Sequence, residues 1–407
     1  MNVLIALAGL SLVIWVYLAL FRGGYWRATE RLSGEDAVPE PWPNVVALVP
    51  ARDEADVIAR SLASILGQDY PGHLEVVLVD DHSTDGTAEA ALEAAAKSGH
   101  EARLTVVAAR ELPAGWSGKL WALSEGLAQA ESAAVAADFI WLSDADIEHT
   151  PSTLRRLVAK AQAERRDLVS LMAVLHCRAF WERLLIPPFV YFFQMLYPFP
   201  WVNDPRQQTA AAAGGCVLVR RAALTAAGGF GAIRGALIDD CALARRIKDL
   251  TLTGDPAATG GGIWLGLAEG SRSIRPYEGL AGIWRMVART AYTQLNHNPL
   301  LLAGTLLGLA VTYLAPPLLV VLTPWHGAAT AALLSAATWL LMAVTAWPTF
   351  RAYGQAAWQS LTLPLAAALY AAMTFDSARR HWQGRGGAWK GRVQPPSGAL
   401  ARPPRDL

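Results

Sequence analysis

The sequence has few cysteines and almost no net charge. Its 407 residues carry 35 Lys and Arg against 34 Asp and Glu, for a net charge of +1. This balance argues against a nucleic-acid or other polyanionic partner. Its three cysteines, Cys177, Cys216 and Cys241, are scattered and lack the spacing of a metal site. We therefore expect reduced thiols and no cysteine-held metal.

Charge is missing altogether from four long stretches. Asp, Glu, Lys and Arg are absent from residues 2–21, 300–323, 328–350 and 352–375. About 20 apolar residues in a helix span the hydrocarbon core of a bilayer. The stretches therefore predict an N-terminal membrane anchor at 1–22 and a C-terminal membrane region at 298–376 with two or three spans.

Basic residues flank these stretches. Arg22, Arg27 and Arg31 follow the first one, and residues 377–407 form a basic tail that we expect to be disordered. Because cytoplasmic flanks retain Lys and Arg, we expect both flanks to lie in the cytoplasm. Three full C-terminal spans would place the tail outside. One stretch is therefore predicted to be re-entrant or interfacial, and 352–375 is the candidate because Pro364 interrupts it.

Between the apolar ends, short apolar runs alternate with helical patterns. Predicted strands and helices occupy, in chain order, 45–49, 57–66, 76–79, 88–97, 104–107, 120–130 and 139–142, with a further strand at 217–219. Strands that are apolar throughout indicate an α/β fold with a mostly parallel, Rossmann-like sheet covered on both faces. Ligands of such sheets bind beyond the carboxyl ends of the strands, where the polar motifs of this chain stand.

Polar segments follow the first two predicted strands. Residues 50–54 turn the chain into a helix, and they are either a nucleotide contact or an ordinary acidic helix start. The nucleotide candidates in this segment are Pro50, Ala51, Arg52 and Glu54. After the second strand, Asp81 is a candidate acceptor for the imide N–H of a uracil. Ser83 and Asp85 are expected mainly to cap the next helix.

Two further motifs suit a diphosphate and its metal ion. Lys119 follows glycines at a predicted helix start and is either a phosphate ligand or a solvated lysine; the spacing is not that of a Walker A loop. Asp144 and Asp146 close the fourth strand. Two such carboxylates can hold Mg²⁺ or Mn²⁺ shared with substrate phosphates, which would offset charge on a departing nucleoside diphosphate.

Asp239 and Asp240 begin a predicted helix. Adjacent acids there are either helix N-terminal charge or include a general base for an acceptor hydroxyl. We predict Asp240 as the base and Asp239 as a positioning group. The run 210–216 has almost no side chains; it would let a sugar or a metal approach the backbone, and a packing constraint explains its glycines equally well.

Two apolar segments are candidates for the membrane surface. In residues 283–294, Arg285 and Arg289 lie close together on one helix face, where they would meet lipid phosphate or the diphosphate. Residues 180–201 are rich in aromatic and aliphatic side chains. Paired prolines at 187–188 argue against a clean span, so we interpret this segment as a shelf for a lipid acceptor.

Taken together, the motifs resemble the inverting family 2 glycosyltransferases with a GT-A fold, over about residues 42–294. The tryptophan-rich segments more closely resemble the bacterial hopene-associated glycosyltransferases; they are residues 20–27, 115–122, 180–187 and 237–241. The resemblance implies Asp81 at the nucleotide, Asp146 helped by Asp144 at the metal, and Asp240 as base. Membrane-bound relatives carry Gln-x-x-Arg-Trp before their C-terminal spans, of which this chain keeps only Arg289.

The sequence therefore predicts a GT-A catalytic domain at 42–295 between membrane helices, facing the cytoplasm from the bacterial inner membrane. The expected donor is a nucleotide sugar, a UDP-sugar above all. The expected acceptor is a lipid hydroxyl, on a hopanoid or another polyisoprenoid by the resemblance. Two alternatives stand. A processive polysaccharide synthase should show an intact Gln-x-x-Arg-Trp and more spans. A non-catalytic membrane scaffold would tolerate loss of the acids, all of which are present.

Overall fold

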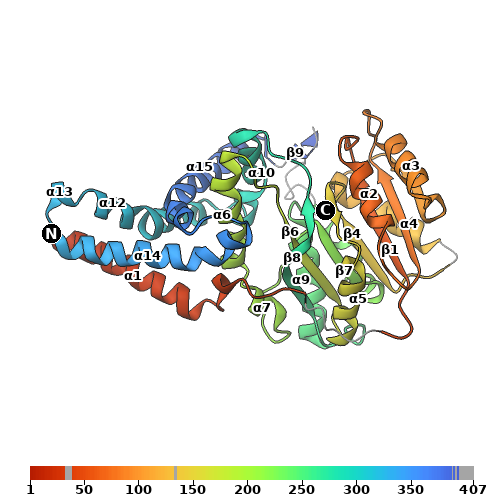
Figure 1. The fold of residues 1–407 in the computed structure, drawn as a ribbon, viewed down its shortest axis with the longest axis horizontal. Coiled ribbons are helices and arrows are strands. Elements are labelled where there is room, and N and C mark those ends of the chain that lie inside the picture. The colour runs from red at the N-terminus through yellow and green to blue at the C-terminus, as the bar shows by residue number, and fades with distance from the viewer. Residues whose placement is uncertain (33–38, 133–134, 387, 390–391, 394–407) are drawn as a thin grey trace, which may run out of the picture. The chain divides into compact units, whose positions relative to one another are not determined.

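The computed structural model describes residues 1–32, 39–132, 135–386, 388–389 and 392–393 (Figure 1). The chain forms two compact units. Of the described residues, an α/β unit takes those within 30–175 and 201–275 together with 388–389 and 392–393, and a helical unit takes residues 1–29, 176–200 and 276–386. Segments 180–196 and 279–294, placed by the sequence analysis inside the range 42–295, group with the apolar helices. Most of the predicted basic tail lies outside the described residues.

One eight-stranded sheet organises the α/β unit, in the order β3-β2-β1-β4-β7-β6-β8-β5. The strands are β1 Val45–Ala51, β2 Leu74–Asp80, β3 Leu104–Ala108, β4 Phe139–Ser143, β5 Ile147–His149, β6 Leu168–Val174, β7 Cys216–Arg220 and β8 Ile263–Ser273. Strands β1 to β4 pair in parallel, whereas β7 runs antiparallel to β4 and β6. The predicted α/β Rossmann-like fold is confirmed, with a mixed second half of the sheet.

The helices of the α/β unit are α2 Ile58–Leu66, α3 Thr87–Ser98, α4 Gly118–Glu131, α5 Thr153–Ala163, α8 Arg221–Ala226 and α9 Asp239–Thr253, with 3₁₀ turns η2 Glu101–Arg103 and η3 Phe230–Ile233. Helices α2, α3 and α4 form where the hydrophobic periodicity predicts them, and α9 begins at Asp239 as expected, whereas α5 and α8 were not predicted. On α2, Ile58, Leu62 and Ile65 are fully buried in the core that β1 also enters. Because every residue of β1 is buried, both faces of the sheet centre are covered and polar groups collect at the strand ends.

The helical unit contains the apolar stretches. Its helices are α1 Asn2–Phe21, α6 Phe180–Leu196, α10 Gly279–Gln294, α11 Pro299–Leu309, α12 Ala315–Val321, α13 Thr323–His326, α14 Ala329–Ala352 and α15 Leu363–Trp382, with η1 Tyr25–Arg27, the π-turn η4 Ala310–Leu314 and η5 Ala357–Thr362. Helix α7 Phe199–Asn203 links the units, and β9 Ala388–Trp389 pairs with β10 Arg392–Val393. By length and composition, four described segments could cross a membrane: Asn2–Phe21, Pro299–Val321, Ala329–Ala352 and Ala357–Trp382.

A side chain of the first segment, Asn2–Phe21, replaces a backbone hydrogen bond that is missing from the second, Pro299–Val321. Pro316 and Pro317 have no N–H, so the carbonyl of Thr312, four residues before Pro316, loses its helical donor. The indole N–H of Trp15 donates to this carbonyl at 2.8 Å, and Ser11 Oγ lies 3.4 Å from it. Since an unpaired carbonyl is costly in hydrocarbon, the bond ties α1 to the η4 turn.

Candidate active site

The carboxyl ends of β1, β2 and β4 supply most of the predicted site residues. Register pairs Ala51 of β1 with Asp80 of β2, so the segments that follow these strands lie side by side. The N–H of Asp81 donates to the Ala51 carbonyl at 2.8 Å. Arg52 Nη1 donates to the Asp81 carbonyl at 2.5 Å and lies 3.7 Å from its carboxylate. Asp81 is therefore buried beside Arg52 at this edge of the sheet.

Side chains of the second loop hold the first turn in place. Ser83 Oγ accepts from the N–H of Asp53 at 3.0 Å, and Thr87 Oγ1 accepts from that of Glu54 at 2.8 Å. Asp85 accepts from the N–H of Thr87 at 3.1 Å. The expectation that Ser83 mainly caps the next helix is wrong, because its hydroxyl is turned to the neighbouring loop. The N-cap of α3 is Gly86.

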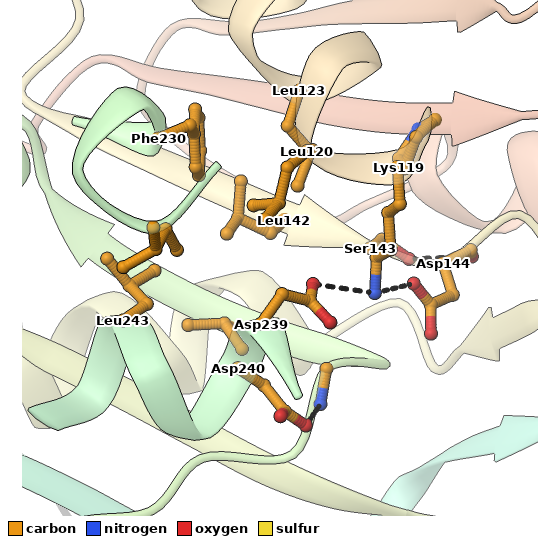
Figure 2. Close-up of a pocket in the computed structure, with 14 residues that line it drawn as sticks. Lys119, Leu120, Leu123, Leu142, Ser143, Asp144, Phe230, Asp239, Asp240 and Leu243 are labelled. Atoms are coloured by element: carbon orange, nitrogen blue, oxygen red, sulfur yellow. Dashed lines mark hydrogen bonds and ion pairs between the residues drawn. The ribbon is translucent and has the colours of Figure 1, made fainter. Parts of the chain in front are cut away.

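Lys119 lies between two of the predicted acids. Ser117 caps α4 by accepting from the N–H of Leu120, which places Lys119 in the first turn. Its Nζ is 2.8 Å from Asp144 Oδ1 and 3.2 Å from Asp239 Oδ2, as Figure 2 shows. Burial works to lower the pKa of Lys119, but the nearby carboxylates, led by Asp144 and Asp239, outweigh it and raise the pKa. The lysine is thus a fixed cation that joins the end of β4 to the start of α9.

Asp146 is buried close to other acids. Its Oδ2 accepts from Ser273 Oγ at 3.1 Å. Burial, together with the charges of Asp144 and Glu54, raises the pKa of Asp146 to about 6. Within the described ranges, no group of three or more His, Cys, Asp or Glu side chains forms a ligand cage. Carboxylate oxygens suit a hard cation, and a cation held by Asp146 and Asp144 would need phosphate oxygens or water as its further ligands.

Asp240 points away from Lys119 toward the small-residue segment (Figure 2). Its Oδ2 accepts from the N–H of Gly214 at 2.8 Å, and its Oδ1 from that of Cys241 at 2.7 Å. Burial and the charge of Asp239 raise the pKa of Asp240 to about 6, although Lys119 and these N–H groups oppose the rise. A Cβ on Gly214 would stand 3.2 Å from Lys119 Nζ and 3.4 Å from Asp240 Oδ2. Glycine here permits the close approach.

A small pocket opens between α4 and α9. Its charged end holds Lys119, Asp144, Asp239 and Asp240. The rest of the wall is mostly hydrocarbon, from Pro50, Leu120, Leu123, Leu142, Val217, Phe230, Ile233 and Leu243. Figure 2 shows Leu120, Leu123, Leu142, Phe230 and Leu243 around the same space. Charge and apolar surface therefore meet at the two acids of α9.

A buried histidine that the sequence analysis missed supports the Asp144–Asp146 turn. His149 Nε2 lies 2.9 Å from Ser143 Oγ, and His149 Nδ1 lies 2.8 Å from Ser271 Oγ. This histidine therefore links the end of β4 to β8. Burial lowers its pKa to about 3, so it is neutral. Nothing in the local sequence signals this contact, because Ser271 is far away along the chain.

Other predicted residues are placed as follows. Glu54 forms an ion pair with Arg275, a residue that the sequence analysis did not single out. Pro50 lines the pocket. Arg289 lies on α10 in the helical unit, and its predicted contact with the diphosphate stays a prediction.

A Rossmann-like sheet with carboxylates at its strand ends and a lysine at the start of α4 is the architecture of a GT-A domain. Residues 46–227 match the family model described as Glycosyl transferase family 2. The chain thus contains a family 2 glycosyltransferase domain, and the predicted assignment to this class of enzyme is confirmed for that domain.

Two curated relatives match shorter segments. An N-acetylglucosaminyltransferase of Mesorhizobium japonicum is 44% identical over 54 residues, 13% of this chain and 13% of that protein. A beta-monoglucosyldiacylglycerol synthase of Synechocystis sp. is 35% identical over 142 residues, 35% of this chain and 27% of that protein. The matches span less than a third of either relative.

A solved structure is similar over most of the chain. The mannosyltransferase of Pyrobaculum calidifontis, determined in complex with GDP-Man and Mn²⁺, superposes with a TM-score of 0.55 at 21% identity. The match covers 91% of this chain and 99% of that one. At this identity the likeness supports the fold.

Proposed function

We propose that the protein is a membrane-bound inverting glycosyltransferase that moves a sugar from a nucleotide sugar to the hydroxyl of a lipid. The donor is a UDP-sugar, and the acceptor is a hopanoid or another polyisoprenoid lipid. The protein sits in the bacterial inner membrane with its catalytic unit on the cytoplasmic face. The family 2 domain and the four apolar segments support this proposal.

One observation carries the proposal. Lys119 binds Asp144, on the side predicted for the donor phosphates, and Asp239, next to the candidate base. An inverting transfer needs both ends within reach of one anomeric carbon, because the base activates the hydroxyl on one side while the diphosphate leaves on the other.

At the acceptor end, Asp240 is the proposed base. Its raised pKa makes the carboxylate a better proton acceptor than an exposed aspartate, while leaving it ionised at neutral pH. The N–H of Gly214 fixes its orientation. Asp239, held by Lys119, positions the acceptor hydroxyl.

At the donor end, Asp146 and Asp144 are proposed to hold Mg²⁺ or Mn²⁺. When bound, this cation would offset charge on the leaving diphosphate. Arg52 and Asp81, with the backbone of residues 50–51, are proposed to contact the nucleotide base. Lys119 and Arg289 would add positive charge near the phosphates.

A lipid acceptor is supported by the pocket and by a relative. The wall next to the α9 acids is hydrocarbon, with Phe230, Ile233 and Leu243, and few hydroxyl or amide side chains there would bind a sugar acceptor. One of the two curated relatives is a beta-monoglucosyldiacylglycerol synthase, whose name describes a glycolipid product.

The test is transfer of radiolabel from a panel of UDP- and GDP-sugars into extractable lipid, using the full-length protein in proteoliposomes that contain hydroxylated hopanoid or diacylglycerol. We expect label in lipid, loss of transfer with EDTA, and inverted anomeric configuration in the product. Asp240→Asn should lose transfer by about 10²-fold or more but still bind nucleotide. Asp249→Asn, an exposed acid on the same helix, should remain active.

Other outcomes would overturn parts of the proposal. Label found only in insoluble polymer would favour a processive synthase. A fully active Asp240→Asn would remove this residue as base. No incorporation from any donor, by folded protein that binds nucleotide, would overturn the lipid acceptor.

A further inference from the structure

The last apolar segment of the helical unit does not cross to the far end of that unit. In Figure 1, α15 lies with α6 and α10 at one end of the helical unit, away from α13. Three contacts within the unit fix its path: one at its C-terminal end, one at its N-terminal end and one at the turn before it.

The C-terminal end of α15 packs beside the start of α11. Ala378 shares a buried cluster with Leu302 and with Tyr292 of α10. The Asp376 carboxylate accepts from Trp284 Nε1 of α10 at 2.8 Å and binds the two arginines that follow it on α15. Helix α15 therefore ends at the level where α11 begins.

The N-terminal end of α15 packs at mid-length of the other apolar helices. Leu363 and Ala367 share a cluster with Tyr313 of η4 and Met342 of α14. Leu302 and Tyr313 are as far apart along their helix as Ala378 and Ala367 are along α15, a rise of about 16 Å at 1.5 Å per residue. Helix α15 thus runs antiparallel to α11 along only part of it.

The turn before α15 reaches the same depth. Trp339, near the middle of α14, donates its indole N–H to the carbonyl of Leu361 at 3.0 Å. After α14 ends at Ala352, the chain folds back along that helix, and α15 then returns. From Leu363 to the first charge, Asp376, an α-helix rises only about 20 Å, less than the roughly 30 Å of a hydrocarbon core.

Both ends of the segment 353–382 lie on the same side of the apolar helices. The start of α14 clusters with α12, through Ala331 and Leu319, so α11–η4–α12 and α14 form an antiparallel pair. The end of α14 therefore lies on the side where α11 starts. The segment leaves from that side and returns to it.

We propose that residues 353–382 form a re-entrant hairpin that enters and leaves the bilayer on the side where α11 starts. Among the described residues, α1, α11–η4–α12 and α14 are then the membrane crossings. The hairpin contacts the acyl chains of one leaflet, to which it presents exposed Trp358, Leu361 and Leu365. Arg379 and Arg380, in the last turn of α15, then lie on the side where α11 starts.

Tags in the full-length protein test the sidedness. One tag follows Leu407, one is inserted at Gly327 between α13 and α14, and one at Gly99 in a surface turn of the α/β unit. In sealed vesicles of both orientations, protease should reach the Leu407 and Gly99 tags from one side and the Gly327 tag from the other. Digestion of the Leu407 tag together with the Gly327 tag would overturn the hairpin.

A depth measurement separates a re-entrant hairpin from one lying on the surface. Nitroxide labels are placed on Leu361→Cys and, as the matched control, on Leu340→Cys, an exposed position next to Trp339 on α14. Accessibility to oxygen relative to a polar nickel complex should give both labels the same depth, near the middle of the bilayer. A Leu361 label at headgroup depth beside a buried Leu340 label would refute the proposal.

Discussion

Replacing Lys119 by Met tests whether this lysine holds the acidic site together. The substitution removes an ammonium 2.8 Å from Asp144 and 3.2 Å from Asp239, and keeps a side chain of similar length. Removing one partner of a fully buried ion pair costs about 3–5 kcal/mol, and an exposed pair is worth about 0–1 kcal/mol. With the Lys119 side chain 22% exposed, we expect a loss of about 2 kcal/mol in the free energy of unfolding.

Thermal unfolding of the detergent-purified protein at pH 8, first without divalent metal, measures this loss. Lys119→Arg keeps the charge and should lose less. Lys97→Met provides a surface control, because Lys97 pairs with Glu93 at an exposed position. That control should change stability by less than about 0.5 kcal/mol.

Adding Mn²⁺ then tests the proposed metal site. A bound cation would supply part of the positive charge that Lys119→Met removes, so saturating Mn²⁺ should raise the Tm of this variant more than that of the wild type. Equal stability of variant and wild type without metal would refute the electrostatic argument. Equal Mn²⁺ shifts would refute the metal site next to Lys119.

Asp240 and Trp15 each allow a further test. Because Asp240 must be ionised to act as a base and its pKa is raised to about 6, kcat/KM should fall as pH drops through about 6. Because the pKa of Asp240 is raised on folding, its ionised carboxylate opposes folding, and the stability contributed by Asp240 should increase as pH drops through about 6. A kcat/KM that does not vary between pH 5 and 8 would contradict Asp240 as the base. Trp15→Phe, which leaves the Thr312 carbonyl without its indole donor, should cost about 1 kcal/mol. The cost should shrink when Pro316→Ala restores a helical N–H, and equal costs in both backgrounds would refute the bond.

The first half of the sheet could be predicted because its signals are local. Strands β1 to β4 each contain a short apolar run, and each predicted helix carries its own periodicity. By contrast, β5 has three residues and β8 contains two glycines and charged residues near its end. Strand β8 forms because it pairs with β6 and β5, and pairing between distant segments leaves little local pattern.

The candidate site was predictable in its parts but not in its connections. Charged residues after a strand identified Asp144 and Asp146, and glycines before a predicted helix identified Lys119. That Lys119 joins Asp144 to Asp239, or that His149 supports the turn between β4 and β5, depends on side chains that meet only in the folded chain. The same limit applied to Ser83, whose hydroxyl had a helix N–H close by in sequence but bonds to the neighbouring loop.

The choice between Asp239 and Asp240 shows how the fold separates two identical neighbours. Consecutive residues on a helix point about 100° apart, so one carboxylate faces Lys119 while the other faces the N–H of Gly214. Asp239 is held by the ammonium of Lys119, whereas the carboxylate of Asp240 accepts from two backbone N–H groups. Asp240 is buried beside the charge of Asp239, and this raises its pKa. Asp239 therefore binds the lysine and helps to raise the pKa of its neighbour, which supports the proposal of Asp240 as the base.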